Sequence, residues 1–534
     1  MADIRIERAL VSVYDKTGLV DFVKGLEALG VEIISTGGTR RLLVESGIRA
    51  LDISDYTGYP EMMDGRVKTL HPRVHGGLLA VRDNPEHVKA MKDHQIQRID
   101  MVVVNLYPFE ATTRKPDVTL AEAIEQIDIG GPSMIRSAAK NHAWVTVVTS
   151  PSQYVRVLDE MKKNGGATTL ETRSELAREV FRLTSHYDRA IANYLETQSG
   201  APQQKYPAAL ELAFTKVGEL RYGENPHLSA AFYRDTSCDE PGVGSAHVIA
   251  GGALSYNNYL DADAALEIVK EFDRPAASVI KHTNPCGAAV ADTLREAFLG
   301  AYSGDPVSAF GDIIGLNRPL DLETARAILK PQNKPEGVVV KVDIIIAPGF
   351  DTKAVELIRT SRKWGESTIF LETGPLTGSY KSRGMSMRTV TGGCLVQDRN
   401  FATWVEKDLK AVTKRKPTKK EMKDLYFAWI VAKHVKSNAI LLAKDETVVG
   451  VGAGQMSRVD AAMIAVYKAA VRAKGSVCAS DAFFPYPDGV EMVLKAGVTA
   501  IVQPGGSKGD EDAIAVADRY AAAMIFTGMR HFRH

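Results

Sequence analysis

Cysteine, net charge and long apolar runs are all scarce in this sequence. The four cysteines among 534 residues lie far apart and form no Cys-x-x-Cys pair, so we expect neither a disulfide framework nor a zinc knuckle. Lysine and arginine total 66, and aspartate and glutamate total 65, so no overall charge attracts nucleic acid or an anionic membrane. No apolar run reaches the roughly 18 residues of a membrane span, and the first residues lack the apolar run of a signal peptide. These absences predict a cytoplasmic protein that binds neither nucleic acid nor a membrane.

The composition that remains is that of a large globular protein. It is 45% hydrophobic and 25% charged, and a chain of this length holds about three domains. Over residues 1–197, helical patterns such as 18–30 and 85–94 separate short apolar runs that lack polar alternation. Such runs are typical of strands buried on both faces; they are 8–14, 31–35, 100–107 and 144–149. This order predicts an α/β domain with a doubly wound, mainly parallel sheet, closed by a long helix over 169–196.

The rest of the chain, 208–534, shows signs of an internal repeat. A polar stretch with proline and glycine, 198–207, is the best linker candidate. Three pairs of motifs then echo each other in the same order: "SVIKHTNPCG" (278–287) with "AKHVKSNAI" (432–440), "SAFGD" (308–312) with "SDAFFPYPDG" (480–489), and "DIIIAPGF" (343–350) with "TAIVQPGGS" (499–507). The echoes predict two similar α/β halves, at about 208–365 and 366–534. We expect the two Lys-His turns to lie near a shared cleft or a dimer seam.

One local run of charge has two interpretations. "KRKPTKK" (414–420) is strongly basic. It carries no interleaved aromatic residues of the kind that bind single-stranded nucleic acid. We therefore favour a solvated loop before a helix over a nucleic-acid patch.

A glycine turn and a cationic segment together suggest a phosphate site. "STGGT" (35–39) follows an expected strand and leads into a helical pattern, where backbone N–H groups and the helix N-terminus attract anions. "GRVKTLHPRVHGG" (65–77) holds Arg66, Lys68 and Arg73 without an acidic residue. If the two segments meet, one phosphate offsets the repulsion among the cations.

Two alternatives for the cationic segment stay open. Its cations could instead pair with distant carboxylates. His71 and His75 have the i, i+4 spacing of a metal pair. However, no glutamate follows His71 as in a zincin motif, so zinc is disfavoured.

Residues after the next expected strands suit proton transfer. "NLYPF" (105–109) ends a strand, where α/β sheets place their sites. Tyr107, Asp128 and Lys140 could serve a reaction around a phosphorylated ligand. Tyr107 as a half-buried aromatic and Asp128 as a helix N-cap remain alternatives.

The second region offers a histidine and two arginines. Lys281 and His282 follow a β-run, and histidine is the natural general base near neutral pH; a surface Lys-His pair is the alternative. Arg221 lies in "LRYGENPH", and Arg530 lies in the terminal "TGMRHFRH". An arginine among aromatics at a terminus suggests a docked tail, although frayed tails are common.

Taken together, these motifs resemble one family. In chain order they are "SVYDKTG", "STGGT", "GRVKTLHPRVHGG", "VVNLYPF", "IDIGGPSM", "AAKNH", "RYGENPH", "KHTNPCG", "SAFGD", "KSNAI", "GAGQMSR", "SDAFFPYPDG", "QPGGS" and "MRHFRH". They resemble the bifunctional purine-biosynthesis family that joins AICAR formyltransferase to IMP cyclohydrolase. The resemblance spans nearly the whole chain. The one departure is Tyr14, where a small residue, often serine, is expected.

The resemblance implies that residues 1–197 form a methylglyoxal-synthase-like domain that closes the ring of the formylated ribotide FAICAR to give IMP. Residues matching the family's phosphate and ribose site are Ser12, Lys16, Thr36, Gly37, Arg66, Lys68 and Thr69. Residues expected around the reacting formyl and amide groups are Lys68, Tyr107, Asp128 and Lys140. The two lysines would stabilise an oxyanion or donate a proton, and Asp128 would steer or accept the amide proton.

The resemblance also implies that residues 208–534 form a duplicated cytidine-deaminase-like domain. It would transfer formyl from 10-formyltetrahydrofolate to the 5-amino group of AICAR. His282 would act as base, Lys281 would tune it, and Asn438 would donate to the formyl oxyanion. Residues expected to bind the ribotide are Arg221, Tyr222, Asn258, Asp343 and Arg530; those expected to shape the folate cleft are Phe310, Gly311, Phe484 and Pro485.

The implied partners are small molecules and a second subunit. We expect AICAR, 10-formyltetrahydrofolate and FAICAR/IMP as ligands, and a homodimer whose transferase sites draw on both subunits. No metal is expected, because the zinc ligands of the deaminase fold are missing; a structural monovalent cation stays possible. The alternative function is a non-catalytic phosphoribotide sensor that uses the N-terminal phosphate site.

Overall fold

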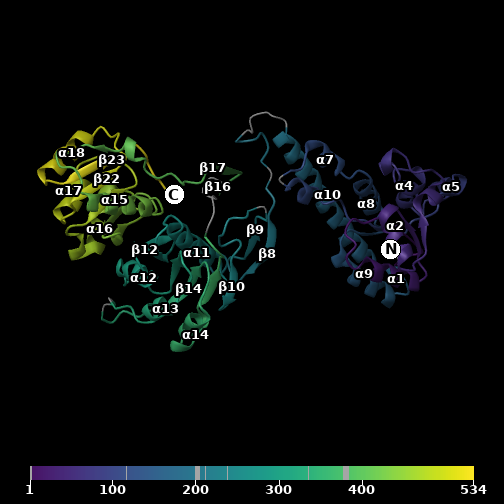
Figure 1. The fold of residues 1–534 in the computed structure, drawn as a ribbon, viewed down its shortest axis with the longest axis horizontal. Coiled ribbons are helices and arrows are strands. Elements are labelled where there is room, and N and C mark those ends of the chain that lie inside the picture. Colours follow the sequence, from purple (N-terminus) through teal and green to yellow (C-terminus); the bar gives the residue numbers. More distant parts are fainter. Residues whose placement is uncertain are drawn as a thin grey trace. The chain divides into compact units, whose positions relative to one another are not determined.

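The chain forms two compact units, Met1–Leu210 and Glu211–His534 (Figure 1). The computed structural model describes residues 3–534 except 116, 199–204, 211, 237, 333, 335 and 377–383, and except the side chain of Asp64. Most of the expected linker, 198–207, lies outside the described residues. Among the described residues, no helix is long and apolar enough to cross a membrane.

A parallel sheet forms the centre of the first unit. Its strands, in spatial order, are β4 (Ala50–Asp52), β3 (Glu32–Ser35), β2 (Arg8–Val11), β5 (Met101–Val103) and β6 (Thr146–Val148). Every neighbouring pair is parallel. Central residues such as Leu10, Val102 and Val147 have no exposed surface, as the unbroken apolar runs predict. The predicted parallel α/β fold is confirmed. A separate antiparallel pair joins β1 (Ile4–Arg5) to β7 (Ala167–Thr168).

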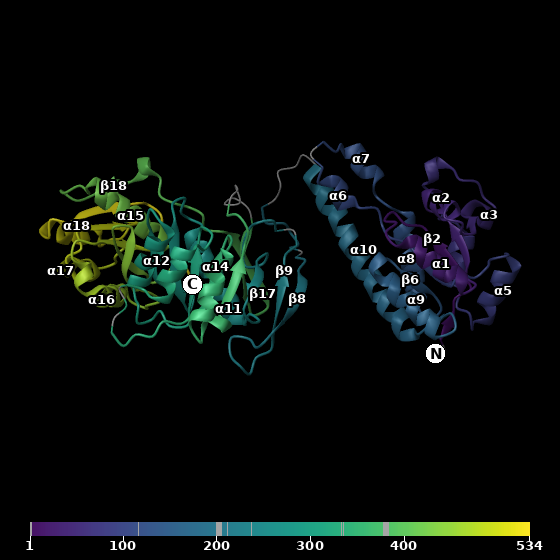
Figure 2. The same ribbon diagram turned by 60° about the horizontal axis from the view of Figure 1, so that its bottom comes forward.

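Helices follow the strands of the first unit and pack around the sheet. They are α1 (Leu19–Ala28), α2 (Gly37–Glu45), α3 (Ile53–Thr57), α4 (Pro72–Leu79), α5 (Pro85–Asp93), α6 (Phe109–Thr113), α7 (Leu120–Glu125), α8 (Gly130–Lys140), α9 (Tyr154–Lys163) and α10 (Leu170–Gln198). The long α10, visible in Figure 2, packs against α8 and β6. The helices predicted at 18–30, 85–94 and 169–196 correspond to α1, α5 and α10.

The second unit is built on one mixed sheet. Its strands, in spatial order, are β10 (His247–Ala250), β15 (Ile369–Glu372), β14 (Val342–Ala347), β13 (Asp312–Leu316), β11 (Ala276–Lys281), β12 (Asn284–Val290), β20 (Thr447–Gly452), β19 (Ile440–Lys444), β21 (Val477–Ser480), β22 (Ala500–Gln503), β23 (Ala523–Phe526) and β18 (Lys410–Ala411). Two antiparallel pairs lie outside it: β8 (Thr215–Leu220) with β9 (Ala230–Arg234), and β16 (Met385–Val390) with β17 (Gly393–Asp398).

The strand order shows a duplication. The order β15-β14-β13-β11-β12 is mirrored by β20-β19-β21-β22-β23, and β12 meets β20 at the seam. The matching helices are α11 (Tyr256–Val269) and α15 (Lys419–Ala432), α12 (Leu294–Ser303) and α16 (Arg458–Ala469), α13 (Leu322–Leu329) and α17 (Asp488–Lys495), and α14 (Thr352–Ser361) and α18 (Asp510–Arg519). The predicted duplication is therefore confirmed.

The structure pairs the two halves differently from the motif echoes. Only 343–350 and 499–507 occupy equivalent places, in and after β14 and β22, because 308–312 leads into β13 whereas 480–489 follows β21. The Lys281–His282 turn joins β11 to β12, so its counterpart is the β19–β20 turn at Asp445–Glu446 and not the segment before β19. Strand order is the firmer guide because short polar motifs recur at strand ends of any kind.

The boundary between the halves also lies later than expected. Strand β15 follows residue 366, yet it pairs with β14 and β10 of the first half. The two Lys-His segments do approach each other at the seam, since Asn284 Oδ1 accepts a hydrogen bond from the Lys436 N–H at 3.0 Å.

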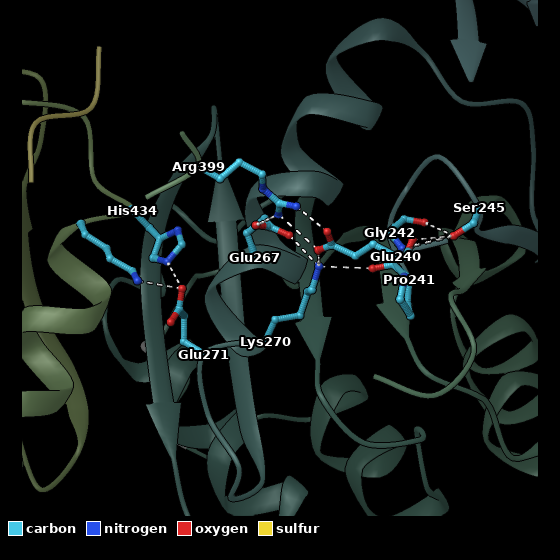
Figure 3. A network of polar contacts seen from close by, with 10 residues as sticks. Glu240, Pro241, Gly242, Ser245, Glu267, Lys270, Glu271, Arg399 and His434 are labelled. Atoms are coloured by element: carbon cyan, nitrogen blue, oxygen red, sulfur yellow. Dashed lines mark hydrogen bonds and ion pairs between the residues drawn. The ribbon is translucent and has the colours of Figure 1, made fainter. Parts of the chain in front are cut away.

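A largely buried polar network surrounds the end of α11 (Figure 3). Arg399, after β17, donates to Glu267 at 2.8 Å and also pairs with Glu240. Lys270 donates to Glu267 at 2.9 Å, and His434 Nε2 lies 3.4 Å from a Glu271 oxygen. Since buried charges are costly unless paired, these contacts fix three separate segments against α11.

Candidate active sites

A cavity of about 570 Å³ lies at the carboxyl ends of the parallel strands of the first unit. Ser12 follows β2, Thr36 follows β3 and Asn105 follows β5. Because β2 lies between β3 and β5, the cavity sits where the strand order reverses, the usual place for a ligand in such sheets. Predicted residues that line it are Ser12, Lys16, Thr36, Arg66, Lys68, Thr69, Tyr107 and Asp128.

Two helix N-termini border this cavity. Helix α2 begins at Gly37 and α8 at Gly130, and neither N-cap side chain accepts a bond from its helix. Thr36, the N-cap of α2, instead has its hydroxyl 2.7 Å from that of Ser12. Backbone N–H groups at the start of α2 therefore favour an anion, whereas the Gly131 N–H of α8 already donates to the Asp128 carboxylate. Gly37 itself faces Lys68, since a Cβ there would lie 3.5 Å from the lysine Nζ.

Protein carboxylates accompany two of the three cations of the segment 65–77. Arg66 pairs with Glu125, and Lys68 Nζ lies 3.7 Å from Glu61. The alternative of pairing with a distant carboxylate thus applies to Arg66, whereas Glu61 stands only seven residues before Lys68. Pairs this exposed hold little free energy. Arg73 does not line the cavity; it donates to the Thr57 carbonyl at 3.0 Å.

Asp128 and Tyr107 are two titratable lining residues whose pKa is shifted; Asp128 is half-buried and Tyr107 is more exposed. Asp128 Oδ1 accepts from the Gly131 N–H at 2.8 Å, so the carboxylate caps α8 and lines the cavity at once. Burial raises the pKa of Asp128, while the Gly131 and Tyr107 N–H groups and Lys68 act in the opposite direction. Burial, with Asp128 nearby, also raises the pKa of Tyr107. Tyr14 packs edge-on to Tyr107 with ring centroids 5.8 Å apart.

One predicted residue lies apart from this cavity, and two residues that hold parts of the site were not predicted from the sequence. Lys140 is exposed at the far end of α8 and is not among the lining residues. Asn105 accepts from the Tyr14 and Asp15 N–H groups at 2.7 and 2.9 Å, which holds the loop after β2. Tyr187 accepts from the Asp128 N–H at 2.8 Å. Asn105 follows a strand, and this position in the sequence could have identified it. Nothing in the sequence around Tyr187 on α10 indicates its contact with Asp128.

In the second unit, Lys281 and three other predicted residues come together in the first half. Lys281 Nζ donates to the Gly311 carbonyl at 3.2 Å and also to that of Phe310. A Cβ on Gly311, where φ is +62°, would lie 3.1 Å from Asp343 and 3.5 Å from Lys281 Nζ. His282 is exposed beside this group.

A second cavity, of about 440 Å³, belongs to the other half. Predicted residues Asn438, Pro485 and Arg530 line it. Phe484 has no exposed surface and does not line it, whereas its neighbour Phe483 does. Lining residues that sequence reasoning missed are Arg458, Phe483, Tyr486, Asp488 and Phe532. Lys281 and His282 do not line this cavity, so the predicted transferase residues do not all share one site.

The Asn438 amide is already engaged in this structure. Its Nδ2 donates to the Gln455 carbonyl at 2.8 Å and to that of Met456 at 3.1 Å, and its Oδ1 accepts from Arg458 at 2.8 Å. Arg458 in turn pairs with the fully buried Asp481. A donor role for Asn438 toward a ligand therefore requires exchange of one carbonyl.

The C-terminal tail is docked, as its arginine-aromatic pattern suggested. The Arg533 N–H donates to Ser437 Oγ at 3.0 Å, and Ser437 N–H donates to the Arg533 carbonyl at 2.9 Å. Arg530 lies over the Phe532 ring at 4.3 Å. The tail thus runs beside Asn438 and brings Arg530 to the cavity rim.

The remaining predicted ligands lie near the start of α11. Arg221 follows β8 and donates to the Tyr222 hydroxyl at 3.1 Å. Asn257 Nδ2 donates to the Glu224 carbonyl at 3.1 Å, which ties this loop to the helix. Asn258 forms the capping box of α11 with Ser255. Among described residues, no group of three or more His, Cys, Asp or Glu could hold a metal ion.

Known proteins match this sequence over nearly its full length. The pattern described as "MGS-like domain" matches residues 18–133, and that described as "AICARFT/IMPCHase bienzyme" matches residues 138–468. Relatives named "Bifunctional purine biosynthesis protein PurH" from Bacillus cereus (strain B4264), Bacillus anthracis and Bacillus thuringiensis (strain Al Hakam) are each 52% identical over 528 residues. These alignments cover 99% of this chain and 100% of theirs. A solved structure titled "Crystal structure of ForH" is 36% identical, covers 35% of this chain and 97% of its own, and has a TM-score of 0.32.

The family pattern covers more than half of the chain, and the relatives align along nearly its full length. The chain therefore belongs to the family of bifunctional AICARFT/IMPCHase enzymes of purine biosynthesis.

Proposed function

We propose that the predicted domain 1–197, which lies within the first unit, closes the ring of FAICAR to give IMP in the 570 Å³ cavity. The ribotide phosphate would bind between the N-termini of α2 and α8, with Lys16, Arg66 and Thr69 around it. It would displace Glu125 from Arg66, an exchange that costs little because both side chains are more than half exposed.

Ring closure forms one C–N bond and releases one water. The carboxamide nitrogen attacks the formyl carbon, and the formyl oxygen leaves as water after it has taken up protons. Because an amide nitrogen is a poor nucleophile, positioning and oxyanion stabilisation carry the rate. Lys68 would stabilise the oxyanion, Asp128 would accept the amide proton, and Tyr107 would orient the reacting groups. Lys140, which was expected to assist, is the last residue of α8 and is not among the residues that line this cavity.

We propose that the second unit transfers the formyl group to the 5-amino nitrogen of AICAR. That nitrogen attacks the formyl carbon, the bond to the folate nitrogen breaks, and the folate nitrogen takes a proton. His282 would accept the proton of the amine, with Lys281 beside it. Arg221, Tyr222, Asn258, Asp343 and Arg530 would hold the ribotide.

The folate co-substrate suits the second cavity. A flat ring with an anionic tail can lie against Phe483, Pro485 and Phe532, with Arg458 and Arg530 near the charge. Phe310 and Gly311, next to Lys281, would form the opposite wall, and Phe484 would support it from the core. No resident metal is needed for either step, and a structural monovalent cation remains compatible.

A homodimer would complete the transferase site. Lys281 and His282 lie outside the cavity that holds Asn438 and Arg530, so a second copy could bring the two groups together. The substrates are AICAR, 10-formyltetrahydrofolate and FAICAR/IMP. We also propose that this purine-synthesis enzyme works in the cytoplasm.

One observation carries the proposal: Ser12, Thr36, Lys68, Tyr107 and Asp128 line one cavity at a sheet's switch point. The test is to supply AICAR and 10-formyltetrahydrofolate to the full chain and to measure IMP. A chain that binds the ribotide but forms neither FAICAR nor IMP would instead fit the non-catalytic phosphoribotide sensor.

A further inference from the structure

The turn that carries His282 has an unfavourable backbone. His282 and Thr283 connect β11 to β12 with φ of 51° and 61°. Residues with a Cβ rarely occupy this left-handed region, and such conformations persist only where the surroundings hold them. The position of the His282 ring therefore depends on what holds the turn.

Asp261 on α11 holds the turn. Its Oδ1 accepts from the Thr283 N–H at 2.6 Å. Burial raises the pKa of Asp261, whereas the N–H groups of Thr283 and His282 and the His282 charge lower it. Hydrogen bonds to a carboxylate are short and roughly twice as strong as those between neutral groups.

The second half of the unit repeats this arrangement. Asp424 on α15 stands six residues after its N-cap Thr418, as Asp261 stands six residues after Ser255. Asp424 Oδ1 accepts from the Glu446 N–H at 2.8 Å. The β19–β20 turn it holds, Asp445 and Glu446, has φ of 54° and 51°. The same helix-to-turn contact was therefore kept in both copies.

The two turns differ in what they present. In the second half, Glu446 pairs with Arg274 at 2.6 Å and with Lys423 at 2.5 Å, so its side chain serves the fold. In the first half, the equivalent turn leaves His282 exposed, and Lys281 reaches the carbonyls beside Asp343. One scaffold thus carries a structural turn in one copy and a candidate general base in the other.

We propose that Asp261 is the positioning residue of the transferase site: it fixes the left-handed turn so that His282 stands ready for the amine of the substrate. This inference rests on the proposed role of His282. Asp261 itself need not touch the substrate. Without its carboxylate the turn relaxes, and displacement of a reacting group by about 1 Å can cost about 100-fold in rate.

The duplicated halves supply a matched control. In the full chain, Asp261→Ala is expected to lower kcat for AICAR formylation by about 10- to 100-fold, with KM for AICAR within about threefold. Asp424→Ala makes the same change in the turn that carries no candidate base, and its kcat should stay within about twofold of wild type. Asp261→Asn retains an oxygen acceptor, so it should recover part of the loss. Ring closure of supplied FAICAR, which belongs to the first unit, checks the amount of active protein.

The outcomes separate the inference from the function on which it rests. Equal losses in Asp261→Ala and Asp424→Ala, an unchanged kcat in Asp261→Ala, or unfolding of Asp261→Ala alone in thermal melts would each overturn the positioning role. A wild-type chain that forms no FAICAR, or a His282→Ala chain with full transfer, would instead refute the proposed function.

Discussion

Replacement of Lys68 by methionine tests the ring-closing cavity most directly. The change keeps an unbranched side chain one atom shorter than lysine and removes the charge. Lys68 Nζ lies beside Gly37 and Gly65, where a Cβ would approach it to 3.5 and 3.3 Å, so it faces the cavity between the N-terminus of α2 and the turn at Gly65. It also lowers the pKa of Asp128, against the effect of burial.

The role and exposure of Lys68 set the expected effects of the substitution on rate, on stability and on the pKa of Asp128. Loss of one oxyanion-stabilising group typically costs about 10²–10³ in kcat, or about 2.7–4 kcal/mol. The pair with Glu61 is 3.7 Å long and partly exposed, so its loss should change the free energy of unfolding by less than about 1 kcal/mol. Because Lys68 no longer favours the ionised form, the pKa of Asp128 should rise. Ring closure needs the ionised carboxylate, so the acid limb of the pH–rate profile for ring closure should move to higher pH.

The assay follows FAICAR consumption across pH and, with the same preparation, AICAR formylation. A slower ring closure, a shifted acid limb and normal formylation are expected. Lys68→Arg keeps the charge and should leave the acid limb in place. If Lys68→Met closed the ring within twofold of wild type, or lost both activities together, the assignment of Lys68 to this reaction would fail.

Three further predictions concern separate parts of the chain. His282→Ala should lower formyl transfer by at least about 100-fold and leave ring closure of supplied FAICAR unchanged; normal transfer would remove His282 from the mechanism. A fragment of residues 1–198, which ends where α10 ends, should fold and cyclise FAICAR; an aggregated fragment would count against the proposed boundary. Burial opposes the ionised form of Glu421, but bonds from Arg415 and Thr418 outweigh it and lower the pKa to about 2. This stabilisation is present above the unfolded-state pKa of about 4.3 and is lost as pH falls toward 2. The difference in Tm between wild type and Glu421→Gln should therefore be largest at neutral pH and shrink over that acid range; a constant difference would contradict the pairing.

Local sequence pattern was enough for the elements and for residues at strand ends. The apolar run 100–107 contains β5, and Ser12 and Thr36 reach the cavity because they directly follow parallel strands. The basic run 414–420 was interpreted as a loop before a helix, and Arg415 indeed pairs with Glu421 of α15. In each case the chain's near neighbours decide the position.

Partners distant in the sequence decided the rest. Arg66 and Glu125 are 59 residues apart, and neither local sequence predicts that they form an ion pair. Lys140 belongs to a conspicuous motif, but ten residues of helix, at a rise of about 1.5 Å each, carry it about 15 Å from the start of α8. The amide of Asn438 is held by carbonyls 17 and 18 residues further on, which no spacing rule predicts.

The seam between β12 and β20 limits how this protein can be divided. Each of these strands covers what would otherwise be the open margin of the other half's sheet. A half expressed by itself would offer unpaired backbone groups along that margin, a template for association with any similar strand. Gene fission should therefore succeed between the two units and yield insoluble products when the cut falls between the halves.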